Sequence, residues 1–232
     1  MLILALDTSA AAGSAALARD GSVLAERAGD GSRNHGERLP RELMDVLELG
    51  GASIREVDLF AVCTGPGSYT GLRVGIASMQ GLALAQRKQI IPVSAFDAFA
   101  SLQPPTSVFR AVWIDARRGE VFASLYGPDG AGTLGPASSL SPAHTLAAWS
   151  DALKGSARVC FAGDGAIRYA DVIRAALGDR AELPDGVPTL AGTIALMAAA
   201  NPERGVAPHA VVPLYVRRTD VELARDRRAA GG

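Results

Sequence analysis

Short hydrophobic runs separated by turn residues divide the first part of the chain into alternating strands and helices. Three runs come first, at Leu2–Leu6, Ser14–Ala18 and Ser22–Glu26, and Asp20-Gly21 marks a hairpin between the last two. Between residues 35 and 49, leucine and valine then recur at helical spacing. The later patterns predict a helix over 35–49, a strand over 57–63, a helix over 70–86, a strand over 90–93 and a brief helix over 95–102.

The pattern then starts again in the second part of the chain. It predicts strands over 108–114, 121–126 and 158–162, helices from Ser141-Pro142 toward Leu153 and over 167–177 and 189–200, and a last extended piece over 211–216. Asp7 corresponds to Asp115, and Cys63 to Cys160. A strand order repeated in this way resembles the duplicated ribonuclease-H-like lobes of actin, hexokinase and Hsp70, the ASKHA superfamily. We therefore expect an α/β fold with mixed sheets flanked by helices, with lobes at 1–103 and 104–217 and a flexible tail at 218–232.

Composition narrows the partners and the compartment. With 232 residues, 48% of them hydrophobic, the chain can bury an ordinary core. A formal charge of −1 makes strong unaided binding to nucleic acid unexpected. Two cysteines in apolar runs favour free thiols and a reducing cytoplasm, and the apolar start reaches Asp7 too soon for a signal peptide or membrane span.

The loops that would bind a nucleotide in this fold lack the usual residues. A phosphate loop needs glycine after its aspartate so that backbone amides can approach the phosphate, but Asp7 is followed by Thr8-Ser9-Ala10. After Asp115 the second loop has two arginines. Both aspartates can equally cap turns at strand ends, and Gly163-Asp164-Gly165 is weak evidence for an adenosine site. The three histidines lie singly, so we expect no metal site and no cofactor.

The stretch from Gly65 to Gly75 is the most distinctive segment. Its glycines can present amides to an anion, or can form a tight turn with Ser68 or Thr70 capping the helix. Small residues form a stripe along the helix that follows: Gly71, Gly75, Ser78, Gly81 and Ala85. The other faces of this helix are apolar too. The surplus apolar surface is either a protein interface or is buried within the chain.

Five stretches resemble the TsaB (YeaZ-like) family over essentially the whole chain: 4–9, 35–40, 65–75, 114–121 and 213–217. The resemblance implies a non-catalytic subunit that pairs with a TsaD-like catalytic subunit and, with a TsaE-like ATPase, supports tRNA threonylcarbamoyladenosine modification. It also implies that Ala95 and Phe99 occupy the positions that bear the metal ligands in the catalytic paralogue. The chain is then expected to contact tRNA only through the complex, and to form a homodimer when alone.

The same resemblance implies a partner interface on the two helices of the first lobe. The implied contact residues are Leu39, Leu43, Leu47, Leu72, Gly75, Ile76 and Met79. On this basis Gly75→Leu is expected to abolish pairing while leaving the lobe folded. Three alternatives stay open: an active ASKHA-fold small-molecule kinase or ATPase, a metallopeptidase-like protein, and a self-assembling scaffold with no role in RNA modification.

Overall fold

The first lobe is built on a five-stranded sheet of order β3-β2-β1-β4-β5. The structure, a computed structural model, describes residues 1–102, 108–128, 132–155 and 158–217. Strand β1 pairs antiparallel with β2 and parallel with β4, which in turn pairs parallel with β5. The strands are β1 (Leu2–Asp7), β2 (Ser14–Arg19), β3 (Ser22–Ala28), β4 (Leu59–Gly65) and β5 (Ile90–Ser94).

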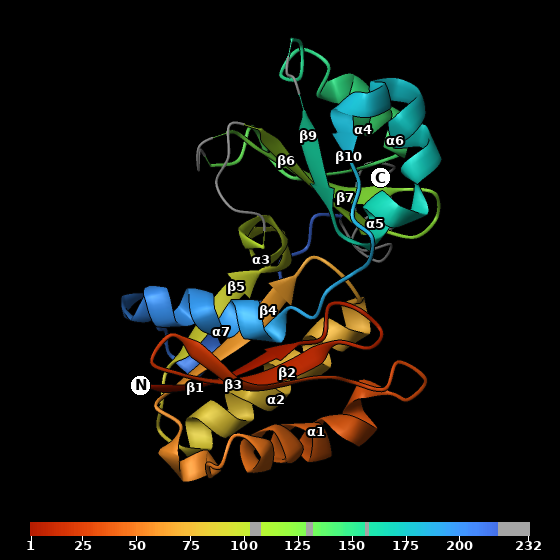
Figure 1. Ribbon diagram of the computed structural model, residues 1–232. Coiled ribbons are helices and arrows are strands. Elements are labelled where there is room, and N and C mark those ends of the chain that lie inside the picture. The colour runs from red at the N-terminus through yellow and green to blue at the C-terminus, as the bar shows by residue number, and fades with distance from the viewer. Residues whose placement is uncertain (103–107, 129–131, 156–157, 218–232) are drawn as a thin grey trace, which may run out of the picture.

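Helices cover both faces of this sheet (Figure 1). On one face lie α1 (His35–Leu49) and α2 (Tyr69–Ala85), with a short 3-10 turn, η1 (Ile54–Glu56), between them in sequence. Leu4, Phe60 and Met79 meet in the core on this side, each fully buried. Helix α7 (Ala191–Ala200) lies across the opposite face, where Ile194 packs against Ile3 and Ala5 in a second core cluster.

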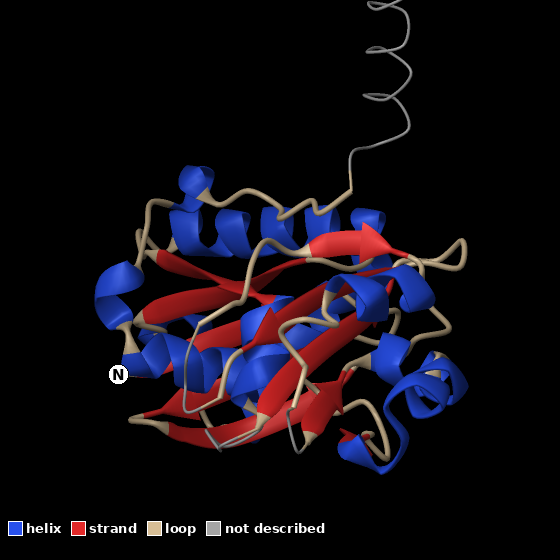
Figure 2. Cartoon of the chain, turned by 90° about the horizontal axis from the view of Figure 1, so that it is seen from above, coloured by secondary structure: helices blue, strands red, loops and turns tan. Residues whose placement is uncertain are grey.

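The second lobe repeats the architecture with a sheet of order β10-β9-β6-β7-β8. Its strands are β6 (Phe109–Asp115), β7 (Val121–Tyr126), β8 (Ser138–Leu140), β9 (Val159–Ala162) and β10 (Ala181–Glu182), and its helices are α4 (Pro142–Ala148), α5 (Asp164–Arg168) and α6 (Ala170–Leu177). Trp113, Trp149 and Phe161 form its aromatic centre. Helix α3 (Ala95–Ser101) joins the two lobes, because Phe96 and Phe99 share one core cluster with Val112 and Phe122 of the second sheet. Figure 2 shows the molecule from above, with helices (blue) lying beside and between the strands (red).

These elements confirm the duplicated fold and correct three details of it. The short edge strands β8 and β10 were not expected, α4 ends at Ala148 before Leu153, and the helix predicted over 167–177 is two helices separated at Tyr169. The proposed boundary at 103/104 and the tail 218–232 lie outside the described residues. Within the described residues, none of the helices combines the length and apolarity that a membrane crossing needs.

Helix α7 differs from the expectation that 104–217 forms the second lobe, since it completes the first one. Two side chains of the first lobe cap its N-terminus. The Ser14 hydroxyl accepts hydrogen bonds from the amides of Leu190 (3.2 Å) and Ala191 (3.0 Å), and the Glu26 carboxylate accepts one from Gly192 (2.9 Å). These acceptors satisfy amides that have no partner within the helix.

After α7 the chain runs back along α2 and then to the second lobe. Short 3-10 turns occur here at η3 (Pro202–Arg204) and η4 (Pro208–Ala210), and earlier at η2 (Gly178–Arg180). We call residues 206–217 the C-terminal strap. Gln80 of α2 donates to the carbonyls of Pro208 and Val211, and the Leu214 amide donates to the Thr64 carbonyl (2.8 Å). Arg217 then donates to the Ala116 carbonyl and pairs with Glu120, so the strap connects α2 with the β6–β7 hairpin. The predicted extended piece over 211–216 is thus bound by individual hydrogen bonds to Gln80 and Thr64, and it pairs with none of the strands of the two described sheets.

Candidate functional site

The seven residues expected at the partner interface all lie inside the first lobe. They sit on the sides of α1 and α2 that face the sheet, and the most exposed of the six larger side chains, Leu43 and Ile76, are each 4% exposed. None of the seven offers surface to a partner. A contact through these helices must use their outer sides, because the inner sides are already packed.

Gly75 has a specific reason to be glycine. An added Cβ would lie 2.1 Å from the Thr8 hydroxyl oxygen and 2.9 Å from the Thr8 methyl group. Gly75→Leu is therefore expected to disrupt the lobe itself, which corrects the expectation that it would test pairing alone. Gly71 and Gly75 permit close approach of α2 to the loop after β1, whereas Gly81 of the same stripe meets no atom within 4 Å.

The outer sides of the same helices expose apolar groups to solvent. On α2, Ala77 and Gly81 are exposed, and Leu84 is 70% exposed. On α1, Met44 and Leu49 are exposed as well. Arg73 is the one charged residue of α2, so most of its outer side has no charge to favour contact with water. Periodicity could not separate this side from the buried one, because α2 is apolar on nearly every face.

The glycine loop before α2 packs against the loop after β1. The Ser68 hydroxyl caps α2 by accepting from the Gly71 amide (3.2 Å), while the Ser68 amide donates to the Ser9 carbonyl (2.7 Å). A Cβ on Gly67 would lie 2.4 Å from that same carbonyl oxygen. The motif therefore has a structural role as a capped turn in close contact with the neighbouring loop.

The two strand-end aspartates do not fit a magnesium nucleotide. Asp7 is buried and accepts the Ser9 amide (2.8 Å), and burial raises its pKa although hydrogen bonds from Ser9 oppose the shift. The Asp115 carboxylate lies 3.4 Å from Arg117 and 3.5 Å from Arg168, so two guanidinium groups already neutralise it. Gly163, in the candidate adenosine turn, has φ +94° and passes against the Trp113 carbonyl, which explains the glycine without a ligand.

The positions that would bear metal ligands, Ala95 and Phe99, are buried in the core shared by the two lobes. Among the described residues, no group of three or more His, Cys, Asp or Glu side chains is placed to hold a metal ion. His144 lies beside the Ser141 hydroxyl at the start of α4, and His209 lies in η4. Cys63 is fully buried, and burial raises the pKa of its thiol well above the usual value.

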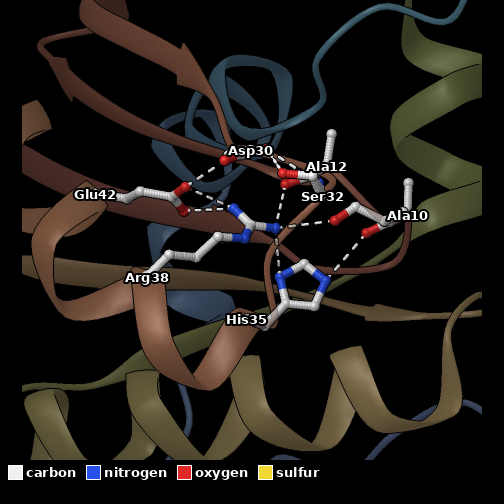
Figure 3. Close-up of polar contacts among 8 residues, drawn as sticks. Ala10, Ala12, Asp30, Ser32, His35, Arg38 and Glu42 are labelled. Carbon is white, nitrogen blue, oxygen red and sulfur yellow. Dashed lines mark hydrogen bonds and ion pairs between the residues drawn. The ribbon is translucent and has the colours of Figure 1, made fainter.

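His35 and Arg38 form a polar cluster that ties α1 to the loop after β1 (Figure 3). The Arg38 guanidinium is nearly buried, pairs with Glu42 at 2.6 Å and donates to the carbonyls of Ala11 and Ala12. His35 Nε2 donates to the Ala10 carbonyl (3.2 Å), which leaves Nδ1 to accept from Arg38 (2.7 Å). Burial and the charge of Arg38 lower the pKa of His35, so the neutral ring is favoured. This cluster positions the first turn of α1, and sequence spacing alone did not reveal it.

Comparison with known proteins gives a consistent result. The family model for TsaD, tRNA N6-adenosine threonylcarbamoyltransferase, matches residues 16–136, just over half of the chain. The tRNA threonylcarbamoyladenosine biosynthesis protein TsaB of Escherichia coli is 39% identical over 133 residues, which are 56% of each protein. The match thus spans about half the length of that relative. An uncharacterised protein of Mycobacterium tuberculosis is 33% identical over 222 residues, covering 95% of this chain and 93% of its own.

Solved structures agree with these sequence matches. A Pseudomonas aeruginosa protein described as similar to peptidase YEAZ superposes with a TM-score of 0.76 at 29% identity, covering 93% of this chain and 99% of its own. Component A of the Acidaminococcus fermentans (R)-2-hydroxyglutaryl-CoA dehydratase superposes with a TM-score of 0.55 at 11% identity, covering 87% of this chain and 98% of its own. The second likeness concerns the fold alone.

Proposed function

Since the chain belongs to the TsaD-type sequence family and, within it, to the TsaB and YeaZ proteins, we propose that it is a non-catalytic subunit in tRNA threonylcarbamoyladenosine biosynthesis. It pairs with a TsaD-like catalytic subunit in the cytoplasm, and a TsaE-like ATPase completes the system. Its own strand-end carboxylates are buried or paired with arginines, as described above, so the ligands for chemistry come from the partner.

The observation that carries the pairing proposal is the outer side of α2 beyond Arg73, which has no charged residue. Ala77 and Gly81 leave a flat surface there, and Leu84 projects from it into solvent. Such a surface lets another helix approach closely and gains free energy when it is covered. In the absence of the catalytic subunit, a second copy of the chain covers the same side and gives a homodimer.

A charge placed on this surface tests the proposal without disturbing the core. Ala77→Arg puts a guanidinium on the exposed side of α2, and Ala175→Arg makes the same change on an exposed position of α6 in the second lobe. Both variants are expected to unfold at the wild-type urea concentration. Ala77→Arg should abolish co-elution with the TsaD-like subunit of the same organism, whereas Ala175→Arg should not.

The proposal fails if the Ala77→Arg protein co-elutes as well as the wild type. Gly81→Arg gives a second measurement on the same side, since a Cβ there meets no atom within 4 Å. Retained pairing in both variants would move the contact to another face. The size of the isolated protein in solution, measured on the same variants, tests the homodimer separately.

A further inference from the structure

Two tyrosines and an arginine form an exposed cluster at the start of α2. The Arg73 guanidinium lies 3.9 Å above the centre of the Tyr69 ring, and its Nε donates to the Tyr215 hydroxyl (2.8 Å). The two rings lie 5.4 Å apart and are tilted by 32°. Tyr69 and Tyr215 are 44% and 40% exposed, so the C-terminal strap holds two aromatic rings and a guanidinium in fixed positions at the surface.

A second group of arginines projects from the tip of the β6–β7 hairpin. Arg117 and Arg118 are consecutive and have φ values of +61° and +54°. Residues other than Gly, Asn and Asp seldom adopt this backbone conformation. Glycine or asparagine would fit this turn at lower cost. Arginine at both positions places two guanidinium groups side by side in sequence at the tip of the hairpin.

Around Asp115 the positive charges lie outside the negative ones, whereas the half-exposed Glu120 of the same hairpin pairs with Arg217. The Arg117 and Arg168 side chains are 75% and 57% exposed, while the Asp115 carboxylate between them is 5% exposed. Asp164 also turns inward, because its carboxylate accepts the Asp115 amide (2.9 Å). Solvent thus meets the guanidinium groups first, although the whole chain carries a net charge of −1.

The C-terminal strap joins the two groups. Arg217 lies two residues beyond Tyr215 and donates to the carbonyl of Ala116, the residue before Arg117. The groups are consequently neighbours along one path of contacts that crosses both lobes. We call this path the arginine–tyrosine rim, made up of Tyr69, Arg73, Arg117, Arg118, Arg168 and Tyr215.

We propose that the arginine–tyrosine rim is a contact surface for single-stranded or loop RNA on this chain itself. Guanidinium groups bind phosphates and stack on bases, and exposed tyrosine rings stack on unpaired bases. Arg117, Arg118 and Arg168 are all exposed, and the phosphates of RNA complement such a concentration of positive charge. The proposal rests on the proposed function, which brings RNA to the complex, and it goes further by giving this subunit its own share of the binding.

Neutral side chains at the hairpin tip test the rim while keeping its backbone. Asparagine tolerates positive φ, so Arg117→Asn/Arg118→Asn removes two charges without refolding the turn. Arg55→Asn/Arg87→Asn is the matched control, because both residues are exposed and Arg87 also has a positive φ (+56°) at the far end of α2. Tyr69→Leu removes a stacking ring, and Tyr69→Phe keeps it.

The readout is fluorescence anisotropy of a labelled anticodon stem-loop RNA, titrated with the complex of chain and catalytic subunit and with the full chain alone. Arg117→Asn/Arg118→Asn is expected to weaken binding about tenfold or more and to flatten the slope of log K against log salt by about 1.4, since each phosphate contact to a single strand contributes about 0.7. Tyr69→Leu should weaken it by about tenfold, and Tyr69→Phe by less than about twofold. The control pair should bind as the wild type does.

Unchanged binding in the rim variants, or an equal loss in rim and control variants, overturns the proposal. Co-elution with the catalytic subunit is measured on the same samples. If the rim variants lose co-elution while the remaining complex binds RNA normally, the rim is a protein contact and the proposal is wrong. If the wild-type chain itself does not co-elute, the proposed function fails, and the titration of the chain alone still decides the rim.

Discussion

Gly75→Ala and Gly81→Ala make the same chemical change on one helix, and the structure predicts opposite effects on stability. Replacing a helical glycine by alanine gains about 1 kcal/mol where nothing obstructs the new methyl group. At Gly81 a Cβ meets no atom within 4 Å. Gly81→Ala should therefore stabilise the protein by about 0.5 to 1 kcal/mol.

At Gly75 the same methyl group enters an occupied space. It would lie 2.1 Å from the Thr8 hydroxyl oxygen and 3.0 Å from the Thr8 Cβ, and Thr8 is fully buried. Overpacking of this kind costs about 1 to 3 kcal/mol, and the close approach to Thr8 places Gly75→Ala in the upper part of that range, about 2 to 3 kcal/mol. After subtraction of the helical gain of about 1 kcal/mol, the net loss is about 1 to 2 kcal/mol. The melting temperature should fall by about 2 to 8 °C, because 1 kcal/mol corresponds to about 2 to 4 °C in a chain of this size.

A double-mutant cycle identifies Thr8 as the cause. Thr8→Ala removes the hydroxyl and methyl groups that the new Cβ would meet, and the hydroxyl oxygen has no hydrogen-bond partner among the described residues. In that background Gly75→Ala should cost at least about 1 kcal/mol less. Urea unfolding at several protein concentrations measures all four proteins and shows any contribution from association. Equal costs of Gly75→Ala in both backgrounds, or a loss of stability in Gly81→Ala, would refute the reasoning.

Three further predictions concern single side chains. Ser14→Ala leaves the first amides of α7 without their acceptor and should lower the free energy of unfolding by about 1 to 2 kcal/mol. The loss should appear as a lower urea midpoint and as faster amide exchange at residues 190–191. Ser22→Ala, on the exposed β3, should change neither measurement. Burial and a hydrogen bond to Glu182 raise the pKa of the Cys160 thiol to about 12. Iodoacetamide should therefore alkylate Cys160 slowly at pH 8, and faster in the Glu182→Gln variant. An alkylation rate that is the same in both proteins would contradict this. The pKa of His35 in the folded protein lies below its ordinary value near 6.5. The unfolded chain therefore binds the proton more readily, and the free energy of unfolding should fall as the pH drops below about 6.5. His35→Asn should reduce this fall in a plot of stability against pH, and parallel plots for the two proteins would exclude His35 as the cause.

The duplicated fold was predictable because most of its strands and helices appear in the sequence as an apolar run or a helical spacing of apolar residues. Strand β1, for example, is a continuous apolar run, and its neighbours follow at hairpin and crossover spacing. The edge strands β8 and β10 were not predictable, since three and two residues are too short for a pattern to show. The position of α7 was also hidden, because its caps, Ser14 and Glu26, lie far away in sequence.

The interface on α1 and α2 stays a prediction, but the seven residues named for it are buried against the sheet and cannot form its surface. Sequence reasoning selected α1 and α2, but it chose the sides that face the sheet, as Leu43 and Ile76 show. On α1 a polar face exists, and most of the apolar positions are buried, although Met44 and Leu49 are exposed. On α2 nearly every face is apolar, so only the packing against the sheet distinguishes the inner residues from Ala77 and Leu84.

The placement of α7 has a consequence for how the protein is made and how it can be divided. The first sheet is complete in sequence by Ser94, yet one of its faces stays uncovered until residues 191–200 have been synthesised. A fragment ending near residue 102 would expose Ile3, Ala5 and Ala61 to water. The first lobe therefore cannot finish folding on the ribosome before most of the second lobe has emerged. The two lobes must therefore be made as one chain for the first to fold, although each has a sheet of its own.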